Sequence, residues 1–228
     1  MHPTPLPLRA VFFDVDGVLL DSLSQYLQFY NDKAREYGLQ GLQLPTVAAF
    51  KRMLGRGVGF SSMLDLLLAG GFPPPLAKRG MKDYERVFVQ RYRPAPFPGI
   101  QHMLKRLADA GLALGLVTFS TRANVEPALT DAMRYFDRRC LFYSDRYSEP
   151  GAKTRCLAEG ARILGLAPAE CIYVGDQSGD ATAAEAAGLR FLGVSYGFGL
   201  KPGDASVYTV NSVPAIADAL LASAARQA

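Results

Sequence analysis

A short apolar segment near the start of the chain, residues 10–13, ends in two aspartates one residue apart and then a glycine. An uninterrupted run of apolar and aromatic residues is typical of a strand buried on both faces of a parallel sheet. Asp14 and Asp16 then lie where the chain leaves the sheet, the edge at which open α/β sheets bind ligands. Gly17 lets the chain turn away without a Cβ atom in its path. An isolated Asp-Gly pair is typical of an ordinary turn, so the rest of the chain decides whether this edge holds a site.

Helices and strands alternate regularly from residue 100 onward. Apolar runs predict strands at residues 112–117, 141–143, 171–174, 191–194 and 208–210. Helical spacing predicts helices at residues 100–110, 123–135, 152–164, 180–187 and 215–222. Pro127 indicates that the second of these helices begins late. The alternation implies an α/β fold with right-handed crossovers and a parallel sheet covered by helices on both faces.

The region between residues 23 and 92 shows helical spacing and no strand-like run. Helices are predicted at residues 23–37, 46–54 and 60–69, and from the prolines at 73–75 to about residue 92. Prolines at 94, 96 and 98 then mark an extended return to the alternating region. This region is therefore predicted to be an inserted helical module with a connector on each side.

The composition excludes several classes of protein. The formal net charge is only +4, from 25 basic and 21 acidic residues, which does not indicate a nucleic-acid partner. No apolar run approaches the roughly 20 residues that span a membrane, and no secretory leader is expected. The cysteines are interpreted as reduced thiols of a cytoplasmic protein; they are Cys140, Cys156 and Cys171. The expected partner is a small molecule, and the expected form is a monomer or a homodimer.

Polar residues follow two further predicted strands at the point where each ends. Thr118 comes directly after the second strand, with Ser120 two residues on, and Asp176 and Asp180 follow the strand at residues 171–174. Taken alone, a threonine there is typical of a helix N-cap and an aspartate of a turn. In a parallel sheet, however, all these strand ends lie on one edge, so the side chains can meet.

Several carboxylates at one edge would repel one another unless a cation lies among them. Oxygen ligands alone favour a hard ion, and Mg²⁺ is the predicted cofactor. The hydroxyl of Thr118 and the ammonium of Lys153 would complete a cradle for a phosphate group. The predicted ligand is a small-molecule phosphate ester, and the predicted chemistry is phosphoryl transfer.

The motifs resemble those of a known family. Residues 14–22, Asp-Val-Asp-Gly-Val-Leu-Leu-Asp-Ser, resemble the first motif of the haloacid dehalogenase superfamily in its phosphatase branch. Thr118 matches the second motif, Lys153 the third and residues 175–180 the fourth. Their order and spacing agree across nearly the whole chain. The dehalogenase branch lacks a carboxylate at the position of Asp16, which argues against hydrolysis of carbon–halogen bonds.

The helical insert is similar to the cap of phosphoglycolate phosphatase-like and β-phosphoglucomutase-like members. The resemblance therefore implies a Rossmann-like parallel sheet core, made of residues 1–18 and 97–228, and an α-helical cap domain of residues 19–96. The cap contains a glycine-rich segment, residues 55–59, in which Arg56 is expected either to contact an acidic group of the substrate or to be solvated.

The resemblance also implies catalytic roles. Asp14 is the expected nucleophile, which forms an aspartyl-phosphate, and Asp16 is the expected acid and base. Thr118 and Lys153 are expected to hold the phosphate. Phe119 and Ser120, which follow the second-motif threonine, are further expected substrate contacts.

The implied metal ligands come from both ends of the chain. Mg²⁺ is expected between the carboxylates of Asp14 and Asp176 and the backbone carbonyl of Asp16, with Asp180 supporting these ligands. Three residues depart from the usual pattern of the family; they are Phe119, Thr154 and Gln177. Since a proline commonly follows the third-motif lysine, Arg155 stays open as an alternative cation for the phosphate.

Three functions are weighed. The first is a Mg²⁺-dependent phosphatase that hydrolyses a small phosphomonoester, with 2-phosphoglycolate as the first candidate. The second is a sugar-phosphate mutase of the β-phosphoglucomutase type, which would use the same aspartyl-phosphate. The third is a non-enzymatic protein. The large insert after the first strand disfavours a phospho-acceptor, and the complete set of carboxylates disfavours a binding protein.

Overall fold

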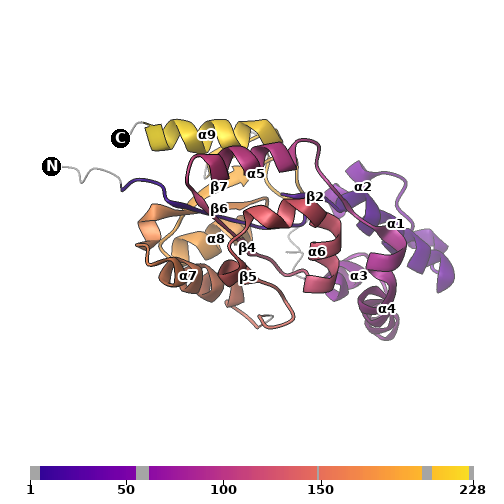
Figure 1. Cartoon of the computed structure of the whole chain (residues 1–228). Helices are drawn as coiled ribbons and strands as arrows, with labels where there is room; N and C mark the ends of the chain where they lie inside the picture. Colours follow the sequence, from indigo (N-terminus) through magenta and orange to yellow (C-terminus); the bar gives the residue numbers. More distant parts are fainter. Residues whose placement is uncertain (1–5, 55–61, 148, 202–206, 226–228) are drawn as a thin grey trace. The chain divides into compact units, whose positions relative to one another are not determined.

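The computed structural model describes residues 6–54, 62–147, 149–201 and 207–225. The chain divides into two compact units (Figure 1). The first, called here the sheet unit, comprises Met1–Leu20 and Pro96–Ala228, and the second, the helical unit, comprises Asp21–Ala95.

The sheet unit contains a six-stranded parallel sheet in the order β5-β4-β1-β6-β7-β8. The strands are β1 (Ala10–Phe13), β4 (Ala113–Val117), β5 (Leu141–Phe142), β6 (Cys171–Gly175), β7 (Arg190–Val194) and β8 (Thr209–Val210). β1 lies at the centre, where Phe13 pairs with Leu116 of β4 on one side and Val174 of β6 on the other. The predicted α/β fold with a parallel sheet is confirmed.

Helices cover both faces of this sheet (Figure 1). Val11 and Phe13 belong to a core that includes α5 (Ile100–Asp109) and α9 (Val213–Ala225). Ala10 and Phe12 belong to the opposite core, with α7 (Ala152–Leu164) and α8 (Ser178–Ala186). Successive strand residues face opposite sides, so a strand covered twice needs the continuous apolar sequence that β1 has.

The helix after β4 differs from the sequence expectation. Pro127 does not delay it: α6 runs from Arg122 to Leu129 with the proline inside, and a 3₁₀ segment follows over Thr130–Tyr135. The start is fixed upstream because the backbone N–H of Arg122 donates to the Asp145 carboxylate at 2.6 Å. Proline removes one hydrogen-bond donor within the helix, and α6 ends two residues later.

The helical unit forms around two long helices that carry aromatic residues, with shorter segments. Its elements are α1 (Leu23–Glu36), a 3₁₀ turn (Gln40–Leu42), α2 (Val47–Leu54), α3 (Met63–Ala69) and α4 (Pro74–Tyr92). Phe29 of α1 lies edge-on to Phe88 and Tyr92 of α4, with ring centroids 5.9 and 5.5 Å apart. Such aromatic pairs bury large apolar surfaces. None of the helices that the structure describes is both long enough and apolar enough to cross a membrane.

A short ribbon forms where the chain passes between the units. β2 (Leu20–Asp21) pairs with β3 (Ala95–Pro96), and the backbone N–H of Phe97 donates to Leu19 at 3.0 Å. The sequence predicted only an extended return here, because two-residue strands are too short to show a period.

Replacing either glycine that contacts Phe12 is expected to destabilise the sheet unit. A Cβ atom at Gly115 would lie 2.6 Å from the Phe12 ring, and one at Gly160 would lie 2.5 Å from it. Since this core is closely packed, Gly115→Ala and Gly160→Ala should each lower the free energy of unfolding by about 1–3 kcal/mol. Urea denaturation measures the change. Gly179→Ala is the control, because its Cβ would meet no other part of the described chain within 4 Å.

Candidate active site

The polar residues singled out from the sequence lie at the carboxyl ends of three adjacent strands. Asp14 follows β1, Thr118 follows β4 and Asp176 follows β6. The ladder continues one residue beyond the apolar run, since the backbone N–H of Asp14 donates to the carbonyl of Val174 at 2.9 Å. The sheet register therefore fixes the backbone on which the site is built.

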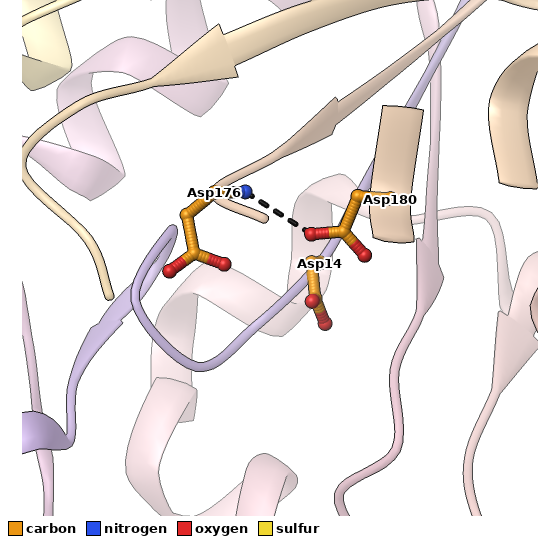
Figure 2. A group of neighbouring side chains, drawn as sticks. All are labelled: Asp14, Asp176 and Asp180. Carbon is orange, nitrogen blue, oxygen red and sulfur yellow. Dashed lines mark hydrogen bonds between the residues drawn. The ribbon is translucent and has the colours of Figure 1, made fainter. Parts of the chain in front are cut away.

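Three carboxylates converge at this edge (Figure 2). One oxygen each of Asp14, Asp176 and Asp180 lies within 4.8 Å of the other two, and all three residues are buried. Asp180 belongs to the first turn of α8, where its Oδ2 accepts hydrogen bonds from the backbone N–H groups of Asp176 and Gln177, both at 3.1 Å. Asp180 thus caps its own helix and fixes the turn that carries Asp176.

Lys153 joins these carboxylates from the first turn of α7. Its Nζ lies 2.7 Å from Asp14 Oδ2 and 2.6 Å from Asp180 Oδ1. A cation near a helix N-terminus is unfavourable, and the two carboxylates offset that effect. Arg155, the alternative cation, instead pairs with Glu149, and both of those side chains are exposed. Lys153 is therefore the cation that the fold brings to the strand ends.

The electrostatics of the site reflect burial opposed by pairing. Burial raises the pKa of Asp14 to about 6, although the charge of Lys153 opposes the rise. Burial, with repulsion from Asp180 and Asp14, holds the pKa of Asp176 well above its ordinary range. Burial alone would lower the pKa of Lys153, but attraction to Asp14 and Asp180 raises it well above 10.5. The lysine is therefore a fixed positive charge at neutral pH.

The carboxylate oxygens at this edge of the sheet suit a hard divalent cation. Asp176 Oδ2 accepts from the backbone N–H of Phe198, whereas Asp176 Oδ1 is buried and has no hydrogen-bond partner in the described part of the chain. A buried carboxylate oxygen without a partner is costly, and a cation beside it would satisfy it. The neighbouring carboxylates of Asp14 and Asp180 supply further oxygen ligands, as Mg²⁺ and Ca²⁺ prefer.

The Asp16 side chain has a different environment from the three converging carboxylates. Its Oδ2 accepts a hydrogen bond from the hydroxyl of Ser120, on the loop after β4. Thr118, which is buried, holds that loop: its N–H donates to the carbonyl of Phe142 and its Oγ1 accepts from the N–H of Ser120, both at 3.1 Å. Phe119 lies between them in sequence, 38% exposed, with its ring centroid 5.0 Å from Lys153 Nζ.

The turn after β1 brings the backbone close to the carboxylates. Gly17 has φ +79°, and a Cβ atom there would overlap the carboxylate of Asp176. Only glycine adopts this conformation readily and leaves that space free.

The hydrogen bond from the backbone N–H of Phe198 to Asp176 was not predicted from the sequence, because a backbone donor carries no residue-type signal. Arg56, the expected substrate contact, lies outside the described residues.

In the absence of metal ions, the protein is expected to become more stable when the pH is lowered from 7 to 5. The pKa of Asp14 is about 6, above its ordinary 3.8, so between these values the folded state binds the proton more readily than the unfolded chain. At pH 7 this difference in proton binding lowers the free energy of unfolding by about 3 kcal/mol. About half of that loss is recovered at pH 5. Asp14→Asn should remove that regained part. Urea denaturation of the unaltered protein and of the variant, in EDTA at both pH values, measures the change. If the stability of both proteins depended equally on pH, Asp14 would not be the buried group responsible.

Comparison with known proteins finds a matching family and a named relative. A family model described as haloacid dehalogenase-like hydrolase matches residues 8–188. A phosphoglycolate phosphatase of Xanthomonas campestris pv. campestris is 31% identical over 204 residues, which cover 86% of this chain and 87% of the relative.

Solved structures show the same fold. A putative phosphoglycolate phosphatase from Lactobacillus delbrueckii subsp. bulgaricus has a TM-score of 0.75 at 18% identity, covering 94% of this chain and 99% of that one. A putative β-phosphoglucomutase from Thermotoga maritima has a TM-score of 0.66 at 23% identity, covering 94% and 99%. Because the family match spans most of the chain and includes the ends of β1, β4 and β6, the protein belongs to the haloacid dehalogenase-like hydrolases, which confirms the resemblance predicted from its motifs.

Proposed function

We propose that this protein is a Mg²⁺-dependent phosphatase that hydrolyses a small phosphomonoester through an aspartyl-phosphate on Asp14. The observation that carries the proposal is the convergence of Asp14 with Lys153 and two further buried carboxylates at one sheet edge. Relatives that are named phosphoglycolate phosphatase support the same reaction class.

The first half of the proposed reaction transfers the phosphoryl group to the enzyme. A carboxylate oxygen of Asp14 forms a bond to phosphorus while the bond from phosphorus to the ester oxygen breaks. Asp16 gives its proton to that leaving oxygen, a contribution worth roughly 10²- to 10⁴-fold in rate. Attack of an anion on an anionic phosphate needs positive charge nearby, which Lys153 provides.

The second half returns the enzyme to its starting state. A water molecule attacks phosphorus, its proton passes to Asp16, and the bond between phosphorus and the Asp14 oxygen breaks. Mg²⁺, when held by Asp14, Asp176 and the Asp16 carbonyl with support from Asp180, would supply further positive charge for both halves. Thr118 is proposed to hold the phosphate with its hydroxyl during both transfers.

The proposed substrate is a small soluble ester, and 2-phosphoglycolate is the first candidate because of the names of the relatives. The helical unit is proposed to act as the cap, with Arg56 as one of its substrate contacts. The similarity to a putative β-phosphoglucomutase concerns the fold alone, so hydrolysis is preferred to mutase activity. The three cysteines are buried free thiols, which fits the proposed cytoplasmic location.

Asp14→Asn is expected to abolish turnover, by at least about 10³-fold, because an amide cannot form the aspartyl-phosphate. The measurement is phosphate release from p-nitrophenyl phosphate and a panel of small phosphate esters, with Mg²⁺ and with EDTA. EDTA should also abolish release, and Mg²⁺ should restore it. Absence of release from every ester by the folded, Mg²⁺-loaded protein would refute the phosphatase proposal. Conversion of one sugar phosphate into its isomer would instead favour the mutase.

Phe119→Ala is expected to raise KM for esters with aromatic leaving groups about fivefold, with a smaller change for 2-phosphoglycolate. The exposed ring beside Lys153 offers apolar surface next to the phosphate position, and losing such a contact costs about 1 kcal/mol. Steady-state kinetics with both kinds of ester measure the change. Tyr208→Ala is the control, because Tyr208 is an aromatic residue that is 70% exposed and does not lie at the end of β1, β4 or β6. An unchanged ratio of the two KM values would show that Phe119 does not contact the leaving group.

A further inference from the structure

We propose that Ser120 is a positioning residue for Asp16: its hydroxyl holds one oxygen of the Asp16 carboxylate and leaves the other to transfer the proton. This inference rests on the proposed phosphatase function, in which Asp16 is the acid and base. It replaces the expectation that Ser120 contacts the substrate, because the structure turns the Ser120 hydroxyl towards Asp16.

The Ser120 backbone is held at both its polar groups. Its N–H donates to Thr118 Oγ1 at 3.1 Å, and its carbonyl accepts from the N–H of Ser144 at 3.1 Å. The residue is only 7% exposed. A buried side chain with a fixed backbone has little freedom to turn elsewhere, so the hydroxyl is kept directed at Asp16.

The Asp16 backbone is held in a tight turn of its own. The carbonyl of Val15 accepts hydrogen bonds from the N–H groups of Val18, Leu19 and Leu20, at 3.2, 2.8 and 2.9 Å. The N–H of Gly17 in turn donates to Leu20 at 2.9 Å. Asp16 therefore projects from a rigid loop towards the loop that carries Ser120.

The parallel sheet connects these two loops. β1 and β4 pair directly, so the loops leave the sheet from neighbouring strands. The separation of Asp16 and Ser120 is thus set by strand pairing and does not depend on the helical unit. The hydrogen bond between them orients the acid before any substrate arrives.

The chemical consequence is a division of labour between the two Asp16 oxygens. The hydrogen of a serine hydroxyl rotates about the Cβ–Oγ bond, so the group can both donate and accept. The Ser120 hydroxyl can therefore stay bonded to Oδ2 whether Asp16 is charged or neutral. The proton is then carried on Oδ1. It passes from Oδ1 to the leaving oxygen as the ester bond breaks, and the attacking water later returns a proton to Oδ1.

The test compares two esters that depend differently on the acid. p-Nitrophenol is a good leaving group and needs little protonation, whereas an alkyl alcohol needs a proton to leave. Ser120→Ala removes the hydroxyl, Ser120→Thr keeps it, and Thr182→Ala removes an exposed helical hydroxyl that donates to Ser178 and serves as the matched control. kcat/KM is measured for p-nitrophenyl phosphate and for the alkyl phosphate that the unaltered protein hydrolyses best.

Ser120→Ala is expected to lower kcat/KM for the alkyl ester about 10-fold or more and for p-nitrophenyl phosphate less than about 3-fold. Ser120→Thr should recover most of the alkyl activity, and Thr182→Ala should match the unaltered protein. Equal losses with both esters, or no loss with either, would overturn the positioning role. If threonine disturbs the folding of this buried site, which thermal denaturation would reveal, the ratio of the two esters for Ser120→Ala still decides.

Failure of the inference differs from failure of the proposed function. If the unaltered, Mg²⁺-loaded protein hydrolyses no ester, the phosphatase proposal is wrong and the inference falls with it. If the unaltered protein is active but the serine variant shows no selective loss, the inference alone is wrong. A rise in KM for both esters without a change in kcat would instead restore Ser120 as a substrate contact.

Discussion

The contact between Lys153 and two buried carboxylates is the interaction on which the site depends. Asp14 and Asp180 each lie within 2.7 Å of the ammonium group, in surroundings where isolated charges are costly. The lysine offsets part of that cost and keeps Asp14 more acidic than burial alone would allow. Within the part of the chain that the structure describes, Asp176 Oδ1 has no such partner. The site is therefore electrostatically incomplete on the side where a cation would bind.

The parallel sheet makes this cluster possible from distant parts of the sequence. Pairing of β1 with β4 and β6 brings together the residues that follow each strand, although about 100 and 160 positions separate them. The helices add to this frame, since α7 presents Lys153 and α8 presents Asp180 from their first turns. Lys153 and Asp180 thus stand on helices, whereas Asp14 and Asp176 directly follow strands. Asp16 differs because its turn after β1 positions it, together with Ser120.

The parts that could be predicted from the sequence are those with a residue-type signal. The apolar run of β1 and the aspartates after β1 and β6 predicted the sheet edge and the carboxylate group. The late start that Pro127 predicted for α6 was wrong, because the backbone of Arg122 is fixed by Asp145, a contact between residues 23 positions apart. The backbone donor at Phe198 and the partner of Ser120 have no sequence signature either. The choice between Lys153 and Arg155 needed side-chain directions, which spacing alone does not give.

The departures from the usual motifs also differ in whether the backbone or the side chain matters at each position. Gln177 departs from the usual fourth motif, but its backbone N–H donates to Asp180 Oδ2, and any residue except proline supplies that group. Thr154 stands where a proline is common, within the first turn of α7. Backbone N–H groups there have no partner in the helix, so the fold does not require a residue that lacks one. Phe119 differs because its side chain is exposed beside Lys153. The backbone contact of Gln177 thus preserves the carboxylate site through that change, whereas the change at Phe119 alters the surface that a substrate would meet.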